Sequence, residues 1–282
     1  MVKIIADSTC DLSAELIARG DIHILPLHIL LGDQEYLDGQ SITPEEIFNW
    51  SDANRTTPKT SAASMEEAKQ LLRPLLNEGH EVICFAISSS MSATCQNMLL
   101  AANELQAEDR VCVMDAQNLS TGTGLLVMEA AEMAKAGCSL QEIRQRIESL
   151  IPRVRASFVV DTLTYLHRGG RCSGLAALAG GALRLHPRIA VTNGVMAAGK
   201  KYRGRMNHVL ADYVSEMKDE LLHADPQRVF ITHSGCDQTV VAAIRQQLAE
   251  LDHFKEIHET RAGGVISSHC GPGTLGVLFI GQ

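Results

Sequence analysis

Five hydroxyl side chains fall within seven positions of the segment FAISSSMSATCQNMLL, at Ser88, Ser89, Ser90, Ser92 and Thr94. An apolar, strand-like run precedes these residues and a helix-like pattern follows them. The amino end of a helix offers free N–H groups and a partial positive charge, and hydroxyl donors beside it make a site suited to an anion. One hydroxyl is enough to cap the helix, so five of them favour a binding site.

The segment PKTSAASMEEA places a second hydroxyl cluster directly before a predicted helix, at Thr60, Ser61 and Ser64. Ser64 and Glu67 have the spacing of a capping box, in which each side chain bonds to the backbone N–H of the other residue. Ser64 is therefore expected to have a structural role. Thr60 and Ser61 remain available to bind a ligand.

Two glycine-rich segments add an arginine and a histidine. In HRGGRCSG the paired glycines allow unusual backbone angles, and Arg171 follows them. In SSHCGPG, His269 precedes a rigid Gly-Pro-Gly turn. Residues 271–276, GPGTLG, have the spacing of a dinucleotide-binding loop, but the tail after them is too short for the helix that such a loop must begin. We predict a tight turn and a final strand there.

The elements that must position these side chains alternate between strand and helix in the first half of the chain. Strands are predicted at 2–7, 80–88 and 110–116, and helices at 12–20, 43–52, 64–79, after Ser92, and at 121–137. Residues 22–32 are predicted to be extended, with Pro26 confining them to an edge or a bend. This alternation predicts a parallel sheet with helices on both faces.

The second half of the chain has a different pattern. A helix is predicted at 139–154, a strand at 156–163, a turn at 164–174 and a helix rich in small residues after it. Asn193-Gly194 predicts a hairpin turn, and a helix and a strand–helix unit follow. We expect an α/β protein of two domains, a Rossmann-like parallel-sheet domain at 1–155 and an α+β domain at 156–282.

Composition limits the classes of function. The chain has 282 residues, 45% of them hydrophobic, and a formal net charge of −8, which fits a globular protein and disfavours nucleic acid as a partner. Its start, MVKIIADST, lacks the apolar run of a signal peptide, and no stretch reaches the length of a membrane span. We therefore expect a cytoplasmic protein without stable membrane anchoring. Eight Cys occur without a C-x-x-C pair, so no metal site is predicted.

Six short motifs, in this order, resemble those of one family. They are ADSTCDL, KTSAAS, SSSMSAT, YLHRGGRCSG, YRGR and HCGPGTLG. The chain resembles the DegV family over nearly its whole length. Members of that family are fatty-acid-binding proteins that act as the lipid-carrying subunit of bacterial fatty acid kinase, in phospholipid metabolism. The chain departs from the family pattern at Ala63, which replaces Pro, and at Ala93, which replaces Gly, and Cys95, Cys172 and Cys270 also lie within or next to the motifs.

The resemblance implies a role for each candidate residue. The carboxylate of a long-chain fatty acid is expected between the two domains, with Thr60 and Ser92 as direct donors and Ser61 close by. His269 is expected beside the head group, and Arg171 is expected to support it. No cofactor is implied. Neutral donors suit a head group that must later be phosphorylated, because they orient it without a fixed ion pair.

The acyl chain requires an apolar tunnel. In GLAALAGGAL, small residues alternate with Leu175, Leu178 and Leu183, which makes this segment a candidate for the tunnel wall. Close packing of a helix rich in small residues explains the same pattern, and composition does not decide between the two.

A partner must supply ATP, because the sequence contains no phosphate-binding loop. In the family a separate kinase subunit converts the bound acid into an acyl-phosphate, so this chain is not expected to be an enzyme by itself. Lys200, Lys201, Arg203 and Arg205 form a basic group in an otherwise acidic chain. For the two lysines, an ordinary solvated hairpin explains the pattern as well as a functional role does. For Arg203 the resemblance implies docking or phosphoryl transfer, and His269 is a second candidate to assist that reaction.

Two other classes of function use the same residues. One is a stand-alone hydrolase or acyltransferase with Ser92 as nucleophile and His269 as base. Neither an orienting carboxylate nor a nucleophile elbow is evident in the sequence. The other is a thiol sensor that uses Cys95 or Cys270 near the lipid head group.

Overall fold

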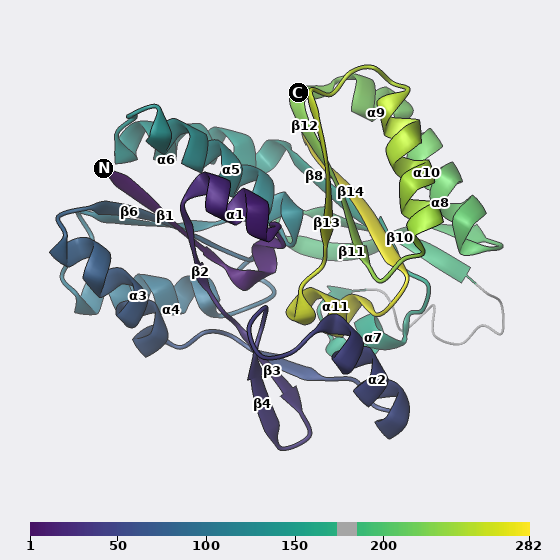
Figure 1. Cartoon of the computed structure of the whole chain (residues 1–282), viewed down its shortest axis with the longest axis horizontal. Coiled ribbons are helices and arrows are strands. Elements are labelled where there is room, and N and C mark those ends of the chain that lie inside the picture. The colour runs from purple at the N-terminus through teal and green to yellow at the C-terminus, as the bar shows by residue number, and fades with distance from the viewer. Residues whose placement is uncertain (174–184) are drawn as a thin grey trace.

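The structure, a computed structural model, describes residues 1–173 and 185–282 (Figure 1). Two large sheets lie side by side, and a small third sheet lies below them in this view. The architecture confirms the predicted α/β class with a parallel N-terminal sheet. The small-residue helix and its Leu175, Leu178 and Leu183 fall outside the described residues.

The N-terminal sheet has four parallel strands in the order β2-β1-β6-β7. These are β1 (Val2–Asp7), β2 (Ile22–Leu25), β6 (Glu81–Ala86) and β7 (Val111–Asp115). Ile4, Ile5, Ile83 and Phe85 are all buried, because helices cover both faces of the sheet. Because β1 and β6 are parallel neighbours, their carboxyl ends lie at the same edge of the sheet, where the hydroxyl loop after β6 begins.

Helices lie on both sides of this sheet (Figure 1). One layer contains α1 (Ala14–Gly20), α5 (Thr121–Lys135) and α6 (Leu140–Leu150), and the other contains α3 (Met65–Asn77) and α4 (Thr94–Glu104). Ser64 and Glu67 form the predicted capping box at the start of α3, so the structural role of Ser64 is confirmed.

A three-stranded antiparallel sheet, in the order β4-β3-β5, lies below the parallel sheet in Figure 1. Its strands are β3 (His28–Leu31), β4 (Gln34–Leu37) and β5 (Lys59–Ser61), and α2 (Pro44–Asn54) lies between the last two in sequence. Pro26 separates β2 from β3, as the predicted bend requires. Strand β5 was not predicted. It pairs Thr60 with Ile29, so Thr60 is held by a sheet and not by a loop.

The C-terminal half forms a mixed seven-stranded sheet in the order β13-β12-β14-β8-β10-β11-β9. Its strands are β8 (Val154–Val159), β9 (Cys172–Ser173), β10 (Leu185–Thr192), β11 (Val195–Arg203), β12 (Ala224–Ser234), β13 (Glu256–Arg261) and β14 (Thr274–Gly281). Asn193 and Gly194 have φ of 51° and 79°, which confirms the predicted hairpin turn between β10 and β11.

Helices α8 (Met206–Glu216), α9 (Lys218–Leu222) and α10 (Gln238–Ala249) lie on one face of the seven-stranded sheet (Figure 1). Helix α5 contacts β8 and β14 on this sheet and β1 on the parallel sheet. It therefore lies between the two large sheets, and one hydrophobic core extends from Ile4 to Phe230 and Leu278. This shared core fixes the relative position of the two halves.

The predicted turn at 164–174 is wrong in its first part, because α7 (Thr164–Gly169) forms there. Tyr165 and Leu166 are buried, and Gly170 ends the helix with a left-handed φ of 67°. Helix α11 (Gly264–Cys270) and strand β13 were also not predicted, and neither were the 3₁₀ turns Ser8–Cys10 and Ile151–Arg153. Helix α11 and the two 3₁₀ turns are too short for a periodic pattern to reveal them, and β13, with the sequence EIHETR, contains few apolar residues.

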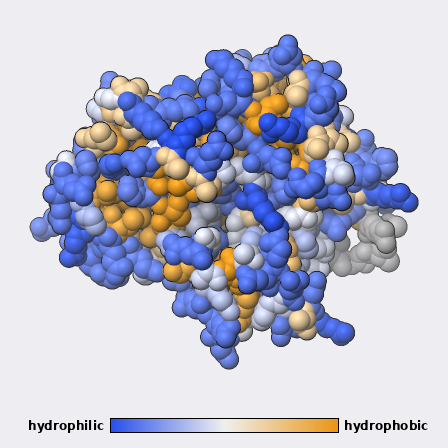
Figure 2. Space-filling view, in the orientation of Figure 1, coloured by the Kyte–Doolittle hydropathy of each residue, from blue (hydrophilic) through white to orange (hydrophobic). Residues whose placement is uncertain are grey.

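Polar residues cover most of the face in Figure 2, and hydrophobic residues show there as separate patches. Among the helices in the described part of the chain, none combines the length and the apolar character needed to cross a membrane.

Candidate functional site

One cavity of about 230 Å³ brings the predicted binding residues together. Its lining contains all five of them, Thr60, Ser61, Ser92, Arg171 and His269. Thr60, Ser61 and Ser92 come from the N-terminal half of the chain, whereas Arg171 and His269 come from the C-terminal half. The cavity therefore lies where the two halves meet.

Thr60 and His269 contact each other directly in this cavity. The distance from Thr60 Oγ1 to His269 Nε2 is 2.8 Å. The other ring nitrogen, Nδ1, is buried and has no hydrogen-bond partner among the described residues. A Cβ atom on Gly169 would lie 2.4 Å from Nδ1, so the first glycine of the GGR motif leaves the space that the imidazole ring occupies.

His269 is a neutral group at pH 7. Burial and the positive charge of Arg171 lower the pKa of His269 to about 4. Arg171 is held nearby, because its Nη1 donates to the carbonyl oxygen of Gly169 at 2.6 Å. The site thus contains a single permanent cation, Arg171, among the side chains that line the described cavity.

We expect His269 to titrate near pH 4 when its ring resonance is followed by NMR, in contrast to the ordinary value of 6.5. Because the pKa is lower in the folded state, the unfolded chain takes up the proton first as the pH falls. The stability of the wild type should therefore decrease between about pH 6.5 and 4 relative to His269→Asn. A titration midpoint near 6.5 would contradict the neutral, buried imidazole.

The hydroxyl loop divides its side chains between structure and site. Ser88 Oγ donates to the carbonyl oxygen of Gly194 at 2.7 Å, which ties the loop to the β10–β11 hairpin. Ser89 Oγ donates to Asp115 at 2.5 Å. Of the five hydroxyls, only that of Ser92 belongs to the cavity lining. At least two of the five hydroxyls therefore stabilise the loop itself, so the number of hydroxyls overstates how many donors the loop offers to a ligand.

Ser92 lies just before the amino end of α4. The N-cap residue is Ala93, which provides no side-chain hydrogen bond. Ser92 Oγ lies 2.9 Å from Thr94 Oγ1 and accepts from the Thr94 N–H at 3.3 Å. If the buried Thr94 hydroxyl donates to Ser92, the Ser92 proton is free for a ligand. Ala93 has φ of −81°, so this departure from the family glycine introduces no backbone strain.

Ala63, the other departure, lies in a well-packed position. Its side chain is fully buried, and its carbonyl oxygen accepts a hydrogen bond from Asn97 Nδ2 at 2.7 Å. This bond links the segment after Thr60 to helix α4. The two segments that supply the hydroxyls Thr60 and Ser92 are therefore connected to each other.

Apolar side chains form the remaining walls of the cavity. Besides Ala93, they are Leu27, Ala62, Ile87, Met91, Met196, Val265 and Ile266. Sequence reasoning missed all of these residues, because an apolar residue in a strand or a short helix gives the same signal whether it faces a core or a cavity. The cavity combines neutral donors, one cation and apolar walls, which suits an amphiphilic anion.

The cysteines near the site are poor candidates for thiol chemistry. Burial raises the pKa of Cys95 to about 11 and also raises the pKa of Cys172 and Cys270. Because the thiolate is the reactive form, a raised pKa lowers reactivity at neutral pH. The geometry therefore disfavours a thiol sensor.

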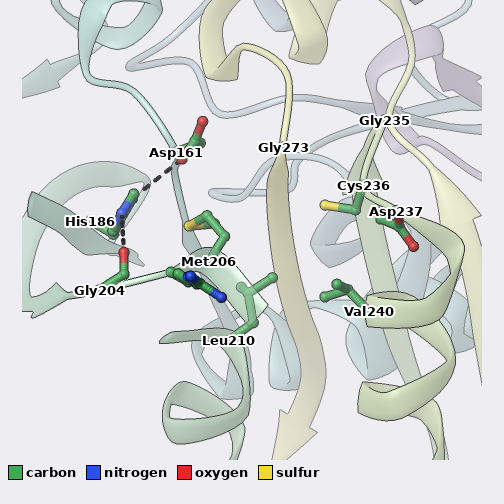
Figure 3. A pocket seen from close by; sticks show the side chains of 11 residues that line it. Asp161, His186, Gly204, Met206, Leu210, Gly235, Cys236, Asp237, Val240 and Gly273 are labelled. Atoms are coloured by element: carbon green, nitrogen blue, oxygen red, sulfur yellow. Dashed lines mark hydrogen bonds and ion pairs between the residues drawn. The ribbon is translucent and has the colours of Figure 1, made fainter. Parts of the chain in front are cut away.

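A second cavity, of about 660 Å³, lies elsewhere in the C-terminal half (Figure 3). Its lining includes Arg205 but none of the five predicted head-group residues. His186 Nε2 lies 3.2 Å from the carbonyl oxygen of Gly204, and Nδ1 lies 3.6 Å from Asp161 Oδ1 (Figure 3). Nδ1 also lies 3.3 Å from the carbonyl oxygen of Val160. The contact with Gly204 holds the chain directly after Arg203.

The basic group of the hairpin does not reach the first cavity. Lys200 forms an ion pair with Glu216 and lies over the Tyr202 ring, which supports an ordinary structural role for this lysine. Arg203, at the end of β11, is exposed and forms no ion pair with any described residue. Its guanidinium is therefore available to a partner.

A sequence profile with the description "Uncharacterised protein, DegV family" matches residues 1–282. The chain belongs to the DegV family. A DegV domain-containing protein of Deinococcus radiodurans is 34% identical over 280 residues, which cover 99% of this chain and 98% of that protein. Protein DegV of Bacillus subtilis is 27% identical, with 99% of this chain and 98% of that protein covered. The resemblance inferred from the six motifs is confirmed.

Solved structures of DegV proteins have the same fold. One is a DegV family protein from Thermus thermophilus whose structure is described as showing fatty acid binding. It is 32% identical to this chain with a TM-score of 0.92, and the match covers 100% of this chain and 99% of that protein. DegV from Bacillus subtilis, described as a fatty acid binding protein, is 26% identical with a TM-score of 0.85, covering 100% and 99%.

Proposed function

We propose that this protein binds a long-chain fatty acid and presents its carboxylate to a partner kinase, which forms the acyl-phosphate. The observation that carries the proposal is the convergence of Thr60, Ser92 and His269 on one cavity with apolar walls. The DegV structures described as fatty acid binding support the class of ligand. We also propose that residues 1–155 and 156–282 act as two domains that enclose the head group.

In this proposal Thr60 and Ser92 donate to the carboxylate, and Ser61 lies close by. With a hydrogen on Nε2, His269 donates to Thr60 Oγ1, and the Thr60 hydroxyl proton is then free to point at the ligand. Arg171 supplies a positive charge beside the anion. Hydrogen bonds from neutral groups hold the carboxylate while leaving its oxygen free to attack a phosphoryl group.

The acyl chain supplies most of the binding free energy. Each buried CH₂ contributes about 0.8 kcal/mol, so a chain of roughly fifteen carbons gives about 12 kcal/mol before the costs of association. Leu27, Ile87 and Met196 line the apolar side of the cavity from which such a chain would extend. We propose Leu175, Leu178 and Leu183 as further tunnel residues.

Mass spectrometry of the purified protein tests this function. After denaturation and solvent extraction, we expect free long-chain fatty acids in the organic phase and an unmodified polypeptide mass. A stable acyl group on Ser92 would instead support the hydrolase. Protein that carries no lipid and takes up none from added fatty acid would contradict the proposal.

The isolated protein is expected neither to hydrolyse activated esters nor to consume ATP. The hydrogen bonds of the site disfavour a nucleophile–base pair, since His269 Nε2 bonds to Thr60 and Ser92 Oγ bonds to Thr94. The measurement is turnover of a chromogenic ester and release of phosphate from ATP at increasing protein concentrations. Ester turnover that scales with protein and disappears in Ser92→Ala would establish the hydrolase instead.

A further inference from the structure

Three buried aspartates lie behind the head-group cavity and do not line it. Asp7, Asp11 and Asp38 are 0%, 5% and 2% exposed. Within residues 1–173 and 185–282, none of them forms an ion pair with a Lys, Arg or His side chain. Burial raises the pKa of all three carboxyl groups, that of Asp7 to about 6, so ionising them costs folding free energy. Because these carboxyl groups cost folding free energy, we looked for a role other than stability that explains their burial.

Two of these carboxylates hold the amino end of helix α11. Asp11 Oδ1 accepts from the Gly263 N–H at 2.8 Å, and Asp38 Oδ1 accepts from the Gly264 N–H at 2.7 Å. Ser120 Oγ donates to the second oxygen of Asp11 at 2.5 Å and fixes that side chain. Helix α11 carries Val265, Ile266 and His269 into the cavity, so its amino end sets where these side chains lie.

The same cluster holds two other cavity segments. The second oxygen of Asp38 accepts from Ser8 Oγ at 2.7 Å, and Ser8 Oγ accepts from the Leu27 N–H at 3.1 Å. Asp7 Oδ2 accepts from the Ile87 N–H at 2.8 Å, directly before the hydroxyl loop. The three segments that carry Leu27, Ile87 and His269 are thus all bonded to one buried group of carboxylates.

The glycines at the start of α11 fit this junction closely. A Cβ atom on Gly263 would lie 3.1 Å from Asp11 Oδ1, and one on Gly264 would lie 2.5 Å from Ile29 Cδ1 and 3.0 Å from Asp38 Oδ1. Neither glycine has a positive φ, so the backbone conformation does not require glycine at these positions. The close approach of the neighbouring atoms explains the residue type instead. The backbone at the start of α11 therefore packs directly against the carboxyl groups of Asp11 and Asp38.

We infer that Asp11 and Asp38 are positioning residues for fatty acid binding, which fix α11 so that His269 faces Thr60 across the junction of the two halves. The inference rests on the proposed function. Neither carboxylate touches the cavity, so both act through the helix. Asp7 acts in the same way on the part of the cavity wall that Ile87 forms.

The test compares variants at the junction by fatty acid titration and by the His269 ring resonance, which is assigned among the 11 histidines with His269→Asn. Asp11→Ala removes the hydrogen bond to Gly263. Gly263→Ala adds a methyl group 3.1 Å from Asp11 Oδ1 and so crowds the same contact from the helix. Each is expected to weaken binding about tenfold and to shift the His269 resonance, since small displacements of a binding group have large effects.

Asp11→Asn is the conservative variant. Its amide oxygen still accepts from Gly263, and its NH₂ group donates to Ser120 Oγ, so affinity and the His269 resonance should stay close to wild type. Tyr213→Phe is the control for stability alone. It removes a buried hydroxyl that bonds to Ser157 and Val277 outside the cavity, so it should lower stability and leave affinity unchanged.

Wild-type affinity with an unshifted His269 resonance in both Asp11→Ala and Gly263→Ala would overturn the inference. If Asp11→Ala does not fold, Gly263→Ala decides alone. Equal losses of affinity in Tyr213→Phe and Gly263→Ala would also overturn it, because affinity would then follow stability. A wild type that binds no fatty acid would instead contradict the proposed function, and the His269 resonance would still test the positioning.

Discussion

Replacing Thr60 or Ser92 with alanine is expected to weaken fatty acid binding by about ten- to a hundredfold. Each change removes a proposed neutral donor to the fatty acid carboxylate, and a hydrogen bond to a charged group contributes roughly 1.5–3 kcal/mol. Thr60 has the stronger structural support, because the 2.8 Å contact with His269 orients its hydroxyl. The measurement is a titration of delipidated protein with fatty acid, alongside the unfolding midpoint of each variant.

Two matched variants separate the site from the loop. Thr60→Ser keeps the hydroxyl and should retain most of the affinity. Ser89→Ala removes a hydroxyl from the same loop as Ser92, but one that bonds to Asp115 and lies outside the cavity lining. It should therefore bind fatty acid normally. Unchanged affinity in both Thr60→Ala and Ser92→Ala, with folding intact, would refute the assignment of these donors.

The candidate site residues were easier to recognise in the sequence than the residues around them. Thr60, Arg171 and His269 occur in short motifs whose residue types already indicate their chemistry, and the structure places all three around one cavity. Ser88 belongs to an equally suggestive motif, yet its hydroxyl bonds to Gly194, more than a hundred positions away. A local pattern does not reveal such a long-range partner. Hydroxyls that bind a ligand and hydroxyls that join two segments therefore look alike in the sequence.

The same limit applies to the fold. A long element such as α5 and an apolar strand such as β1 follow from the local pattern of apolar residues. Strand β5 has three residues and exists because β3 lies beside it, which no local signal records. The carboxylates of Asp11 and Asp38 are a similar case. Each is an ordinary acidic residue in the sequence, and only the return of the chain at α11 brings Gly263 and Gly264 against them.

Arg203→Ala is expected to keep its bound fatty acid and to lose acyl-phosphate formation by about tenfold or more when a cognate kinase and ATP are supplied. Arg203 is exposed at the end of β11 and lies outside the cavity lining, so its removal leaves the head-group contacts intact. The contact of His186 Nε2 with the carbonyl oxygen of Gly204 holds the backbone directly after Arg203, from which the exposed side chain projects. A forked donor there suits an acidic partner surface or a transferring phosphoryl group.

Two quantities are measured for Arg203→Ala. They are the lipid content of the purified variant and the amount of acyl-phosphate formed in the reconstituted reaction. Lys201→Ala is the matched control, because it removes an exposed positive charge two positions away on the same strand. It should reduce the rate less than Arg203→Ala does. Arg203→Lys separates charge from geometry, since lysine keeps the charge and loses the fork. If the lipid bound to Arg203→Ala is phosphorylated at the normal rate, the end of the hairpin is only a solvated turn and is not the docking site of the proposed kinase.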